Sequence, residues 1–164
     1  MERSIFRASE IFDMAVGIEE QGIAFYQAAQ TVIPSQIDDV LNYLIAQQRV
    51  HAETFLRMKE EVKDDFLLPE SYPGERANYM DSFTRDQVFF DPVQALKQFE
   101  NVADELDAIR IAVDYERRSI LFYAWIKQIV RKSEADVIDR IIAEEHLHIS
   151  RLLKLRQEIE ESQA

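Results

Sequence analysis

Apolar residues recur every three or four positions in four long stretches of the chain, which is the spacing of one face of an α-helix. These stretches cover residues 9–32, Ser35 to about Lys63, about Val102 to Arg131, and Ser133 to about Glu160. Ser9 and Ser35 are the expected N-caps of the first two helices, and Ser-Glu-Ala-Asp at residues 133–136 resembles a capping box. No strand pattern interrupts them, so the sequence predicts an all-α protein.

Residues 64–100 break this pattern, because prolines, a glycine and scattered phenylalanines replace the helical period. A short helix is expected near residues 76–82, and Asp91-Pro92 looks like an N-cap that opens a helical turn over 92–100. Two short connections and one long crossover between the second and third helices are typical of a ferritin-like four-helix bundle. The length of 164 residues fits one domain over residues 1–164, with 64–100 as its crossover.

The two halves of the chain match each other at a constant offset of 97 residues. Amphipathic hairpins share apolar positions by chance, and that alternative accounts for pairs such as Ile45 and Ile142. It accounts less well for matched polar residues, which favour two copies of one helix hairpin related by a pseudo-twofold axis. The polar matches are Glu19 with Glu116, Tyr26 with Tyr123, and His51 with His148.

Composition narrows the function classes. The chain carries 31 acidic and 19 basic residues, a net charge of −12, which argues against nucleic acid and anionic membranes as partners. It has no cysteine, which excludes disulfides, thiolate catalysis, zinc ribbons and iron–sulfur or rubredoxin centres. No apolar run reaches the roughly 18 residues of a membrane span, and the start has no secretory apolar region, so a cytoplasmic location is expected.

The repeated polar residues predict a metal site. Glu145 and His148 are spaced E-x-x-H and project from one helix face. An isolated E-x-x-H is more often a surface pair, but here His51 and two matched glutamates accompany it. One glutamate from each of two helices, plus E-x-x-H from each of the other two, is the ligand set of di-iron and di-manganese carboxylate bundles. The predicted ligands are Glu19, Gln48, His51, Glu116, Glu145 and His148.

Gln48 is where this chain departs from that ligand set, because a glutamate is expected three residues before His51. Gln47 is also an amide, and Glu53 should face away from the site. Three carboxylates leave about one positive charge on two divalent ions in a medium of low dielectric constant. Gln48 can still offer a neutral amide oxygen. We expect one metal position to be weakly occupied or empty.

Other residues near the predicted site have plainer interpretations. Tyr26 and Tyr123 are either core aromatics whose hydroxyls need a partner or donors to the ligating carboxylates, and the sequence leaves both alternatives open. His146 is expected to face solvent, and Gly22 to ease close helix packing. The remaining aromatics of these segments are expected in the core: Phe25, Phe122 and Trp125.

The segments Glu19 to Tyr26 and Glu116 to Tyr123 resemble the first and third helices of the rubrerythrin branch of the ferritin-like superfamily. Gln48 to Glu53 and Glu145 to His148 are similar to its E-x-x-H helices. The resemblance covers nearly the whole chain and implies a non-haem centre of two iron ions, with manganese or zinc as alternatives. It implies an oxidoreductase that reduces peroxide or oxidises Fe(II) with oxygen, in which Glu19, Glu116 and Glu145 act at the reacting centre.

Two departures from the family leave other functions open. A typical rubrerythrin carries a cysteine-rich rubredoxin domain, which this chain lacks, so it would need a separate electron-donor protein. The extra glutamate near the third-helix ligand is also absent, since Val113 and Ser119 flank Glu116 at three residues. The alternatives are a metal-binding or iron-handling bundle without turnover and a bundle that serves only as an interaction module. A homodimer is open, although no residue pattern marks an interface.

Overall fold

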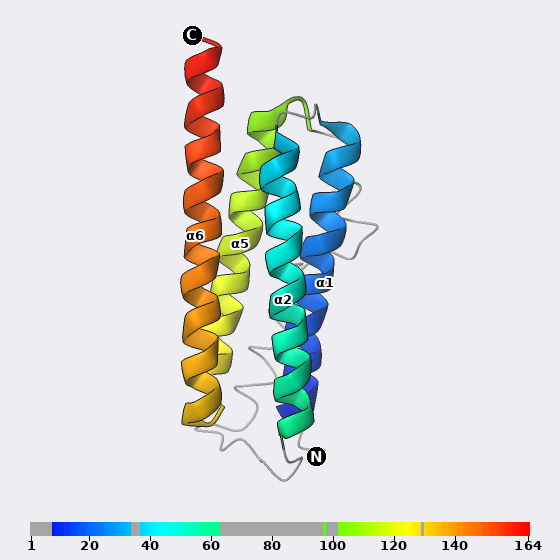
Figure 1. Cartoon of the computed structure of the whole chain (residues 1–164), viewed down its shortest axis with the longest axis vertical. Helices are drawn as coiled ribbons and strands as arrows, with labels where there is room; N and C mark the ends of the chain where they lie inside the picture. Colours follow the sequence, from blue (N-terminus) through cyan, green and yellow to red (C-terminus); the bar gives the residue numbers. More distant parts are fainter. Residues whose placement is uncertain (1–7, 34–36, 63–96, 98–101, 129) are drawn as a thin grey trace, which may run out of the picture.

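The computed structural model describes residues 8–33, 37–62, 97, 102–128 and 130–164. It contains four long helices and no strand within those ranges: α1 (Ala8–Val32), α2 (Asp38–Glu61), α5 (Glu105–Lys127) and α6 (Lys132–Ser162). Figure 1 shows α1 and α6 running in one direction and α2 and α5 in the other. Because α2 and α5 are parallel, the chain between them must travel the length of the bundle. This confirms the predicted four-helix bundle with a long crossover.

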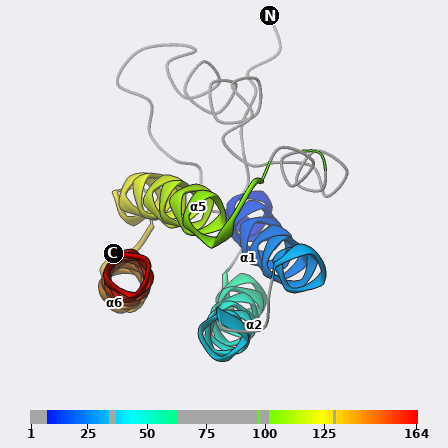
Figure 2. The same ribbon diagram turned by 90° about the horizontal axis from the view of Figure 1, so that it is seen from above.

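The helices form two hairpins that lie side by side. α1 packs along α2 and α5 packs along α6, and contacts between the hairpins join α1 to α5 and α2 to α6. Figure 2 shows this arrangement end on, with each helix next to its hairpin partner. The expected helices near residues 76–82 and over 92–100 fall outside the described residues, apart from Lys97.

Several predicted helix ends were wrong. α1 begins at Ala8, so Ser9 lies inside its first turn, and α2 begins at Asp38 rather than directly after Ser35. α5 begins at Glu105 and ends at Lys127, within the predicted range of 102–131. Its N-cap is Asp104, whose carboxylate accepts the backbone N–H of Asp107 at 2.9 Å. Such a cap stabilises a helix by about 1 kcal/mol.

The start of α6 also differs from the predicted capping box at Ser133. The helix begins at Lys132 with Arg131 as its N-cap residue. The carboxylate of Glu134 accepts the backbone N–H of Arg131 at 2.8 Å and also pairs with its guanidinium. Glu134 is therefore the acidic residue of the capping box, and Ser133 lies within the first helical turn.

Two apolar clusters fill the bundle, one toward each end. Phe25 and Leu44 belong to the first cluster, and Phe12 and Phe55 belong to the second. All four side chains are almost completely buried, and each contributes about 1.5–3 kcal/mol through burial. Glu19 lies between the two phenylalanines of α1, so the polar residues at mid-height are held between two apolar layers.

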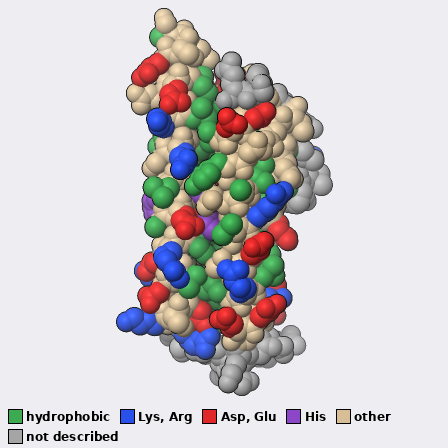
Figure 3. All heavy atoms as spheres, viewed as in Figure 1, with side chains coloured by type: hydrophobic (Ala, Val, Ile, Leu, Met, Phe, Trp, Pro, Cys, Tyr) green, Lys and Arg blue, Asp and Glu red, His purple; other side chains and the backbone are tan. Residues whose placement is uncertain are grey.

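The net negative charge is carried largely by exposed side chains. Figure 3 shows acidic and basic side chains mixed over the face that α2 and α6 present. Among the described helices, none combines the length and the apolar character that a membrane span requires. As predicted, Glu53 and His146 are exposed and Phe25 and Phe122 are buried, whereas Trp125 is only partly buried at the edge of the second cluster.

Candidate metal centre

Six polar side chains from the four helices converge between the two apolar clusters, each of them at most 1% exposed. α1 and α5 each contribute a glutamate, α2 a glutamine and a histidine, and α6 a glutamate and a histidine. Ionised groups at such depth are unfavourable unless they have partners or bind an ion. The structure thus brings together all the residues that the sequence predicts as ligands: Glu19, Gln48, His51, Glu116, Glu145 and His148.

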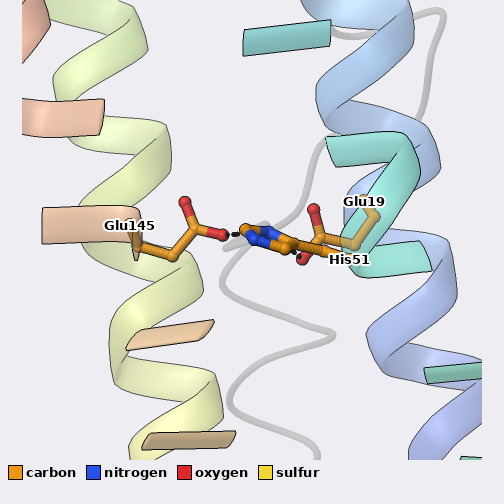
Figure 4. Close-up of side chains that lie close together, drawn as sticks. All are labelled: Glu19, His51 and Glu145. Atoms are coloured by element: carbon orange, nitrogen blue, oxygen red, sulfur yellow. Dashed lines mark ion pairs between the residues drawn. The ribbon is translucent and has the colours of Figure 1, made fainter. Parts of the chain in front are cut away.

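The first group of candidate ligands, which we name the His51 position, consists of Glu19, His51 and Glu145. Nδ1 of His51 lies 2.9 Å from Oε1 of Glu145 and 3.6 Å from Oε1 of Glu19. Figure 4 shows the imidazole between the two carboxylates, which reach it from opposite sides. One ligand atom from each residue lies within 4.8 Å of the others, so the three can hold one cation.

The second group, which we name the His148 position, consists of Glu116, Glu145 and His148. Nδ1 of His148 lies 2.8 Å from Oε2 of Glu145 and 3.6 Å from Oε2 of Glu116. The two imidazoles stack with their centroids 5.7 Å apart. Glu145 therefore turns one carboxylate oxygen to each position, as a ligand shared by two ions would.

Several buried atoms that face this centre have no hydrogen-bond partner in the described part of the chain. Nδ1 of His51 and Oε1 of Glu145 are close, yet neither has a partner in hydrogen-bond geometry. An unsatisfied buried polar atom costs about 1–3 kcal/mol, and oxygen and imidazole nitrogen donors suit divalent transition metals. The residues therefore fit a metal centre. The unsatisfied atoms are Oε2 of Glu19, Oε1 of Gln48, Nδ1 of His51, Oε2 of Glu116 and Oε1 of Glu145.

The three carboxyl groups differ in their tendency to ionise. Burial raises the pKa of Glu19 to about 7 and raises the pKa of Glu116 well above its usual value, with the charge of Glu145 adding to both shifts. Burial opposes the charge of Glu145 as well, but its close contacts with Glu116 and the two histidines hold its pKa below its usual range. The shared carboxylate is thus the most readily ionised of the three.

The two histidines carry protons when no metal ion is bound. Burial opposes the charge of His51, but Glu145 and Glu19 outweigh it and raise the pKa of His51 to about 11. In the same way, Glu116 and Glu145 outweigh burial and raise the pKa of His148 to about 9. Protons therefore offset the carboxylate charge in the metal-free protein, and metal ions would displace them.

Gln48 lies in the centre but directs its amide group toward Glu116. Its Nε2 donates to Oε1 of Glu116 at 3.4 Å, while its own Oε1 has no hydrogen-bond partner among the described residues. The side chain occupies space over Gly22, where a Cβ would lie 2.9 Å from Oε1 of Gln48 and 3.1 Å from Cε1 of Tyr115. Glycine at position 22 therefore makes room for Gln48.

The two matched tyrosines cross between the hairpins. Tyr26 of α1 donates its hydroxyl to Oε1 of Glu116 on α5, and Tyr123 of α5 donates to Oε1 of Glu19 on α1. Both rings are fully buried. The two interpretations left open by the sequence therefore coincide, because the hydroxyls of core aromatics find their partners in the predicted ligands.

Two residues of this centre were missed in the sequence. Oε2 of Glu144 lies 2.7 Å from Nε2 of His51, on the side of the ring away from Glu19 and Glu145. The hydroxyl of Tyr115 donates to the carbonyl of Ile18, and its ring stacks on Phe25. The available signal for Glu144 was the pair of adjacent glutamates at 144–145, which matches a pair of glutamines at 47–48.

Comparisons with known proteins agree with this geometry. The family model described as Rubrerythrin matches residues 10–156. A solved structure from Thermotoga maritima, described as a ferritin-like diiron-carboxylate protein, aligns with a TM-score of 0.70 and 24% identity. The alignment covers 96% of this chain and 99% of that chain, which shows a shared fold. No significant match occurs among curated proteins.

Proposed function

Because the chain belongs to the rubrerythrin family, we propose that it binds two iron ions in the bundle centre and uses them to reduce peroxide or to oxidise Fe(II) with oxygen. The observation that carries this proposal is Glu145, whose two oxygens each face a separate group of candidate ligands. Glu19 and His51 would complete one group, and Glu116 and His148 the other. Manganese and zinc are alternative metals for the same donors.

Bound iron would supply the electrons, since reduction of one peroxide to two waters takes two electrons and two protons. The surrounding residues supply the environment. The apolar clusters exclude water from both ends of the centre, and Tyr26 and Tyr123 hold the glutamates of the opposite hairpin. Glu144 is only partly buried, so its contact with His51 gives the centre a hydrogen-bonded connection to the surface.

Gln48 favours a second candidate function, a metal-binding or iron-handling bundle without redox turnover. With three carboxylates, two divalent ions keep about one positive charge, which weakens binding where water is excluded. Repeated peroxide reduction needs a donor that returns two electrons to the centre, and because the chain has no cysteine for a rubredoxin centre, we propose a separate, cytoplasmic electron-donor protein. Oxidation of Fe(II) needs no such donor, because Fe(II) itself supplies the electrons. A bundle that only binds other proteins would need no metal at all.

Iron loading and rapid mixing test these functions against each other. Metal-free protein loaded with Fe(II) without oxygen should bind close to two ions, and mixing with peroxide or oxygen should then produce ferric absorbance faster than free Fe(II) does. Binding without accelerated oxidation would support iron handling. A metal content near zero after loading would contradict both metal functions and support an interaction module.

Histidine variants test whether iron binds at the buried centre, with His146 as the matched control. The double variant His51→Ala and His148→Ala should lose both iron binding and accelerated oxidation. His146→Ala removes an exposed imidazole from the same helix as His148 and should keep both. Equal loss in the two proteins would contradict the assignment of iron to the buried centre.

A further inference from the structure

The two histidines of the centre differ in what lies behind the ring. Nε2 of His51 contacts the carboxylate of Glu144 at 2.7 Å, whereas Nε2 of His148 has no hydrogen-bond partner in the described part of the chain. The residue that matches Glu144 in the other hairpin is Gln47. A carboxylate behind a ligating histidine orients the ring and raises its basicity. Only the His51 position has this support.

The two glutamates that each belong to one position, Glu19 and Glu116, differ in the hydrogen bonds that they accept. Oε1 of Glu19 accepts one hydrogen bond, from Tyr123. Oε1 of Glu116 accepts two, from Tyr26 and Gln48, so much of its electron density is already engaged. Oε2 of Glu116, which faces His148, accepts no hydrogen bond from the described residues, so the effect is on the carboxylate as a whole: each hydrogen bond draws electron density from it and weakens it as a metal ligand. Glu116 is therefore the weaker donor of the pair.

The charges nearby also favour cation binding at the His51 position over the His148 position. Glu144 adds a carboxylate next to the His51 position. On the other side, the ring of Tyr43 packs edge-on against His148 at 5.9 Å, and the guanidinium of Arg151 lies 4.1 Å from the centre of that ring. The His51 position thus has an extra negative charge nearby, while the His148 position has an aromatic ring and a cation.

We propose that the two metal positions are unequal: the His51 position fills first and retains its ion, and the His148 position binds more weakly and exchanges. This assignment rests on the proposed binding of two metal ions and specifies which of them is held tightly. It follows from two contacts: Glu144 supports His51, and Gln48 donates a hydrogen bond to Glu116 and so withdraws electron density from that ligand.

Titration of metal-free protein with Fe(II) without oxygen tests the assignment by calorimetry and crystallography. Two steps are expected, with affinities at least about tenfold apart. Crystals loaded with one equivalent should show anomalous scattering from iron between Glu19 and His51. A signal at His148, or one divided equally between the positions, would overturn the assignment but leave the proposed function intact. Absence of any binding would overturn both.

Variants of Glu144 connect the inequality to its cause. Glu144→Ala should weaken the first step about 10–100-fold and leave the second nearly unchanged. Glu144→Gln keeps a hydrogen-bond acceptor for Nε2 and should recover part of the loss. Glu53→Ala, which removes an exposed glutamate from α2, is the control and should change neither step. Equal weakening of both steps by Glu144→Ala, or an equal effect of Glu53→Ala, would overturn the role of Glu144.

Discussion

Around the metal centre, the two hairpins share one plan but differ in charge at one pair of adjacent positions. α1 and α5 keep the same glutamate and tyrosine at matched positions, and α2 and α6 keep the same histidine. The difference is a pair of adjacent residues: Gln47 and Gln48 on α2 match Glu144 and Glu145 on α6. α6 therefore supplies the shared carboxylate and the support for His51, while α2 supplies neutral amides. The two hairpins therefore share the same architecture, and the change from two glutamines to two glutamates makes the two metal positions chemically different.

The largest effect should come from Glu145→Gln, because Glu145 serves both positions. Loss of an outer partner of a metal ligand already costs about 10–100-fold in affinity, so we expect a loss of more than about 100-fold at both positions. Glu19→Gln and Glu116→Gln should each weaken one position only. Calorimetric titration distinguishes these patterns, and a Glu145 variant that loses only one binding step would show that the carboxylate is not shared.

Acidification should weaken metal binding strongly. With a pKa of about 11 for His51 and about 9 for His148 in the metal-free protein, both imidazoles carry a proton at neutral pH that a metal ion must displace. Affinity should therefore rise with pH, by about tenfold per unit for each proton displaced, until pH exceeds the pKa. The rise should end sooner at the His148 position. Calorimetry in buffers of different ionisation enthalpy counts the protons released, and a count of zero would contradict protonated histidines.

Restoring the missing carboxylate with Gln48→Glu should reduce the asymmetry between the hairpins. We expect a gain on the order of tenfold at the His148 position, because four carboxylates neutralise two divalent ions. The metal-free variant should melt at a lower temperature, since Glu116 loses an amide donor and gains a carboxyl neighbour. Thermal unfolding with and without metal measures both effects. Unchanged affinity would count against the placement of Gln48 beside the metal.

The two crossing tyrosines should contribute unequally to stability. Tyr123→Phe leaves Oε1 of Glu19 without its hydroxyl donor and should cost about 1.5–3 kcal/mol of unfolding free energy in the metal-free protein. Tyr26→Phe should cost less, about 1 kcal/mol, because Gln48 still donates to Glu116. Urea unfolding of both variants gives the comparison. A larger loss for Tyr26→Phe would reverse the order.

The smallest effects compare two glycines of α1. Gly22→Ala places a Cβ 2.9 Å from Gln48 and should destabilise the protein by about 1 kcal/mol through overpacking. A Cβ at position 17 would meet no other side chain within 4 Å, so Gly17→Ala should stabilise the helix by up to about 1 kcal/mol. Opposite signs in thermal unfolding are expected, and equal signs would argue against close packing at position 22.

The sequence was sufficient for the fold and for the residues that meet in its centre. Apolar spacing determines which face of each helix is buried, and the repeat at a fixed offset places Glu19 opposite Glu116 and His51 opposite His148. Helix ends were harder to predict, because a cap depends on which side chain hydrogen-bonds to the backbone of the first turn, as Glu134 does to the N–H of Arg131. Ser133 and Asp136 offered an equally good pattern in the sequence.

Glu144 could not be found in the same way. Its contact with His51 joins α6 to α2, and whether the two side chains meet depends on the rotation of each helix about its own axis. Periodicity gives that rotation only to within about one residue, or about 100° of helix. Glu144 is only partly buried, so an apolar pattern predicts it as a surface residue. The direction of the Gln48 amide group likewise depends on Glu116, to which its Nε2 donates, and on the space above Gly22.

The crossing of ligands between the hairpins has a consequence for unfolding. Each metal position draws on both hairpins, since Glu19 and His51 come from one and Glu145 from the other, while most other helix contacts lie within a hairpin. An ion bound at either position would link the two hairpins, which could then separate only after the ion had left. The free energy of metal binding would add to the free energy that holds the two hairpins together. The rate at which the protein opens should then be limited by the slowest ion to dissociate rather than by the apolar interface.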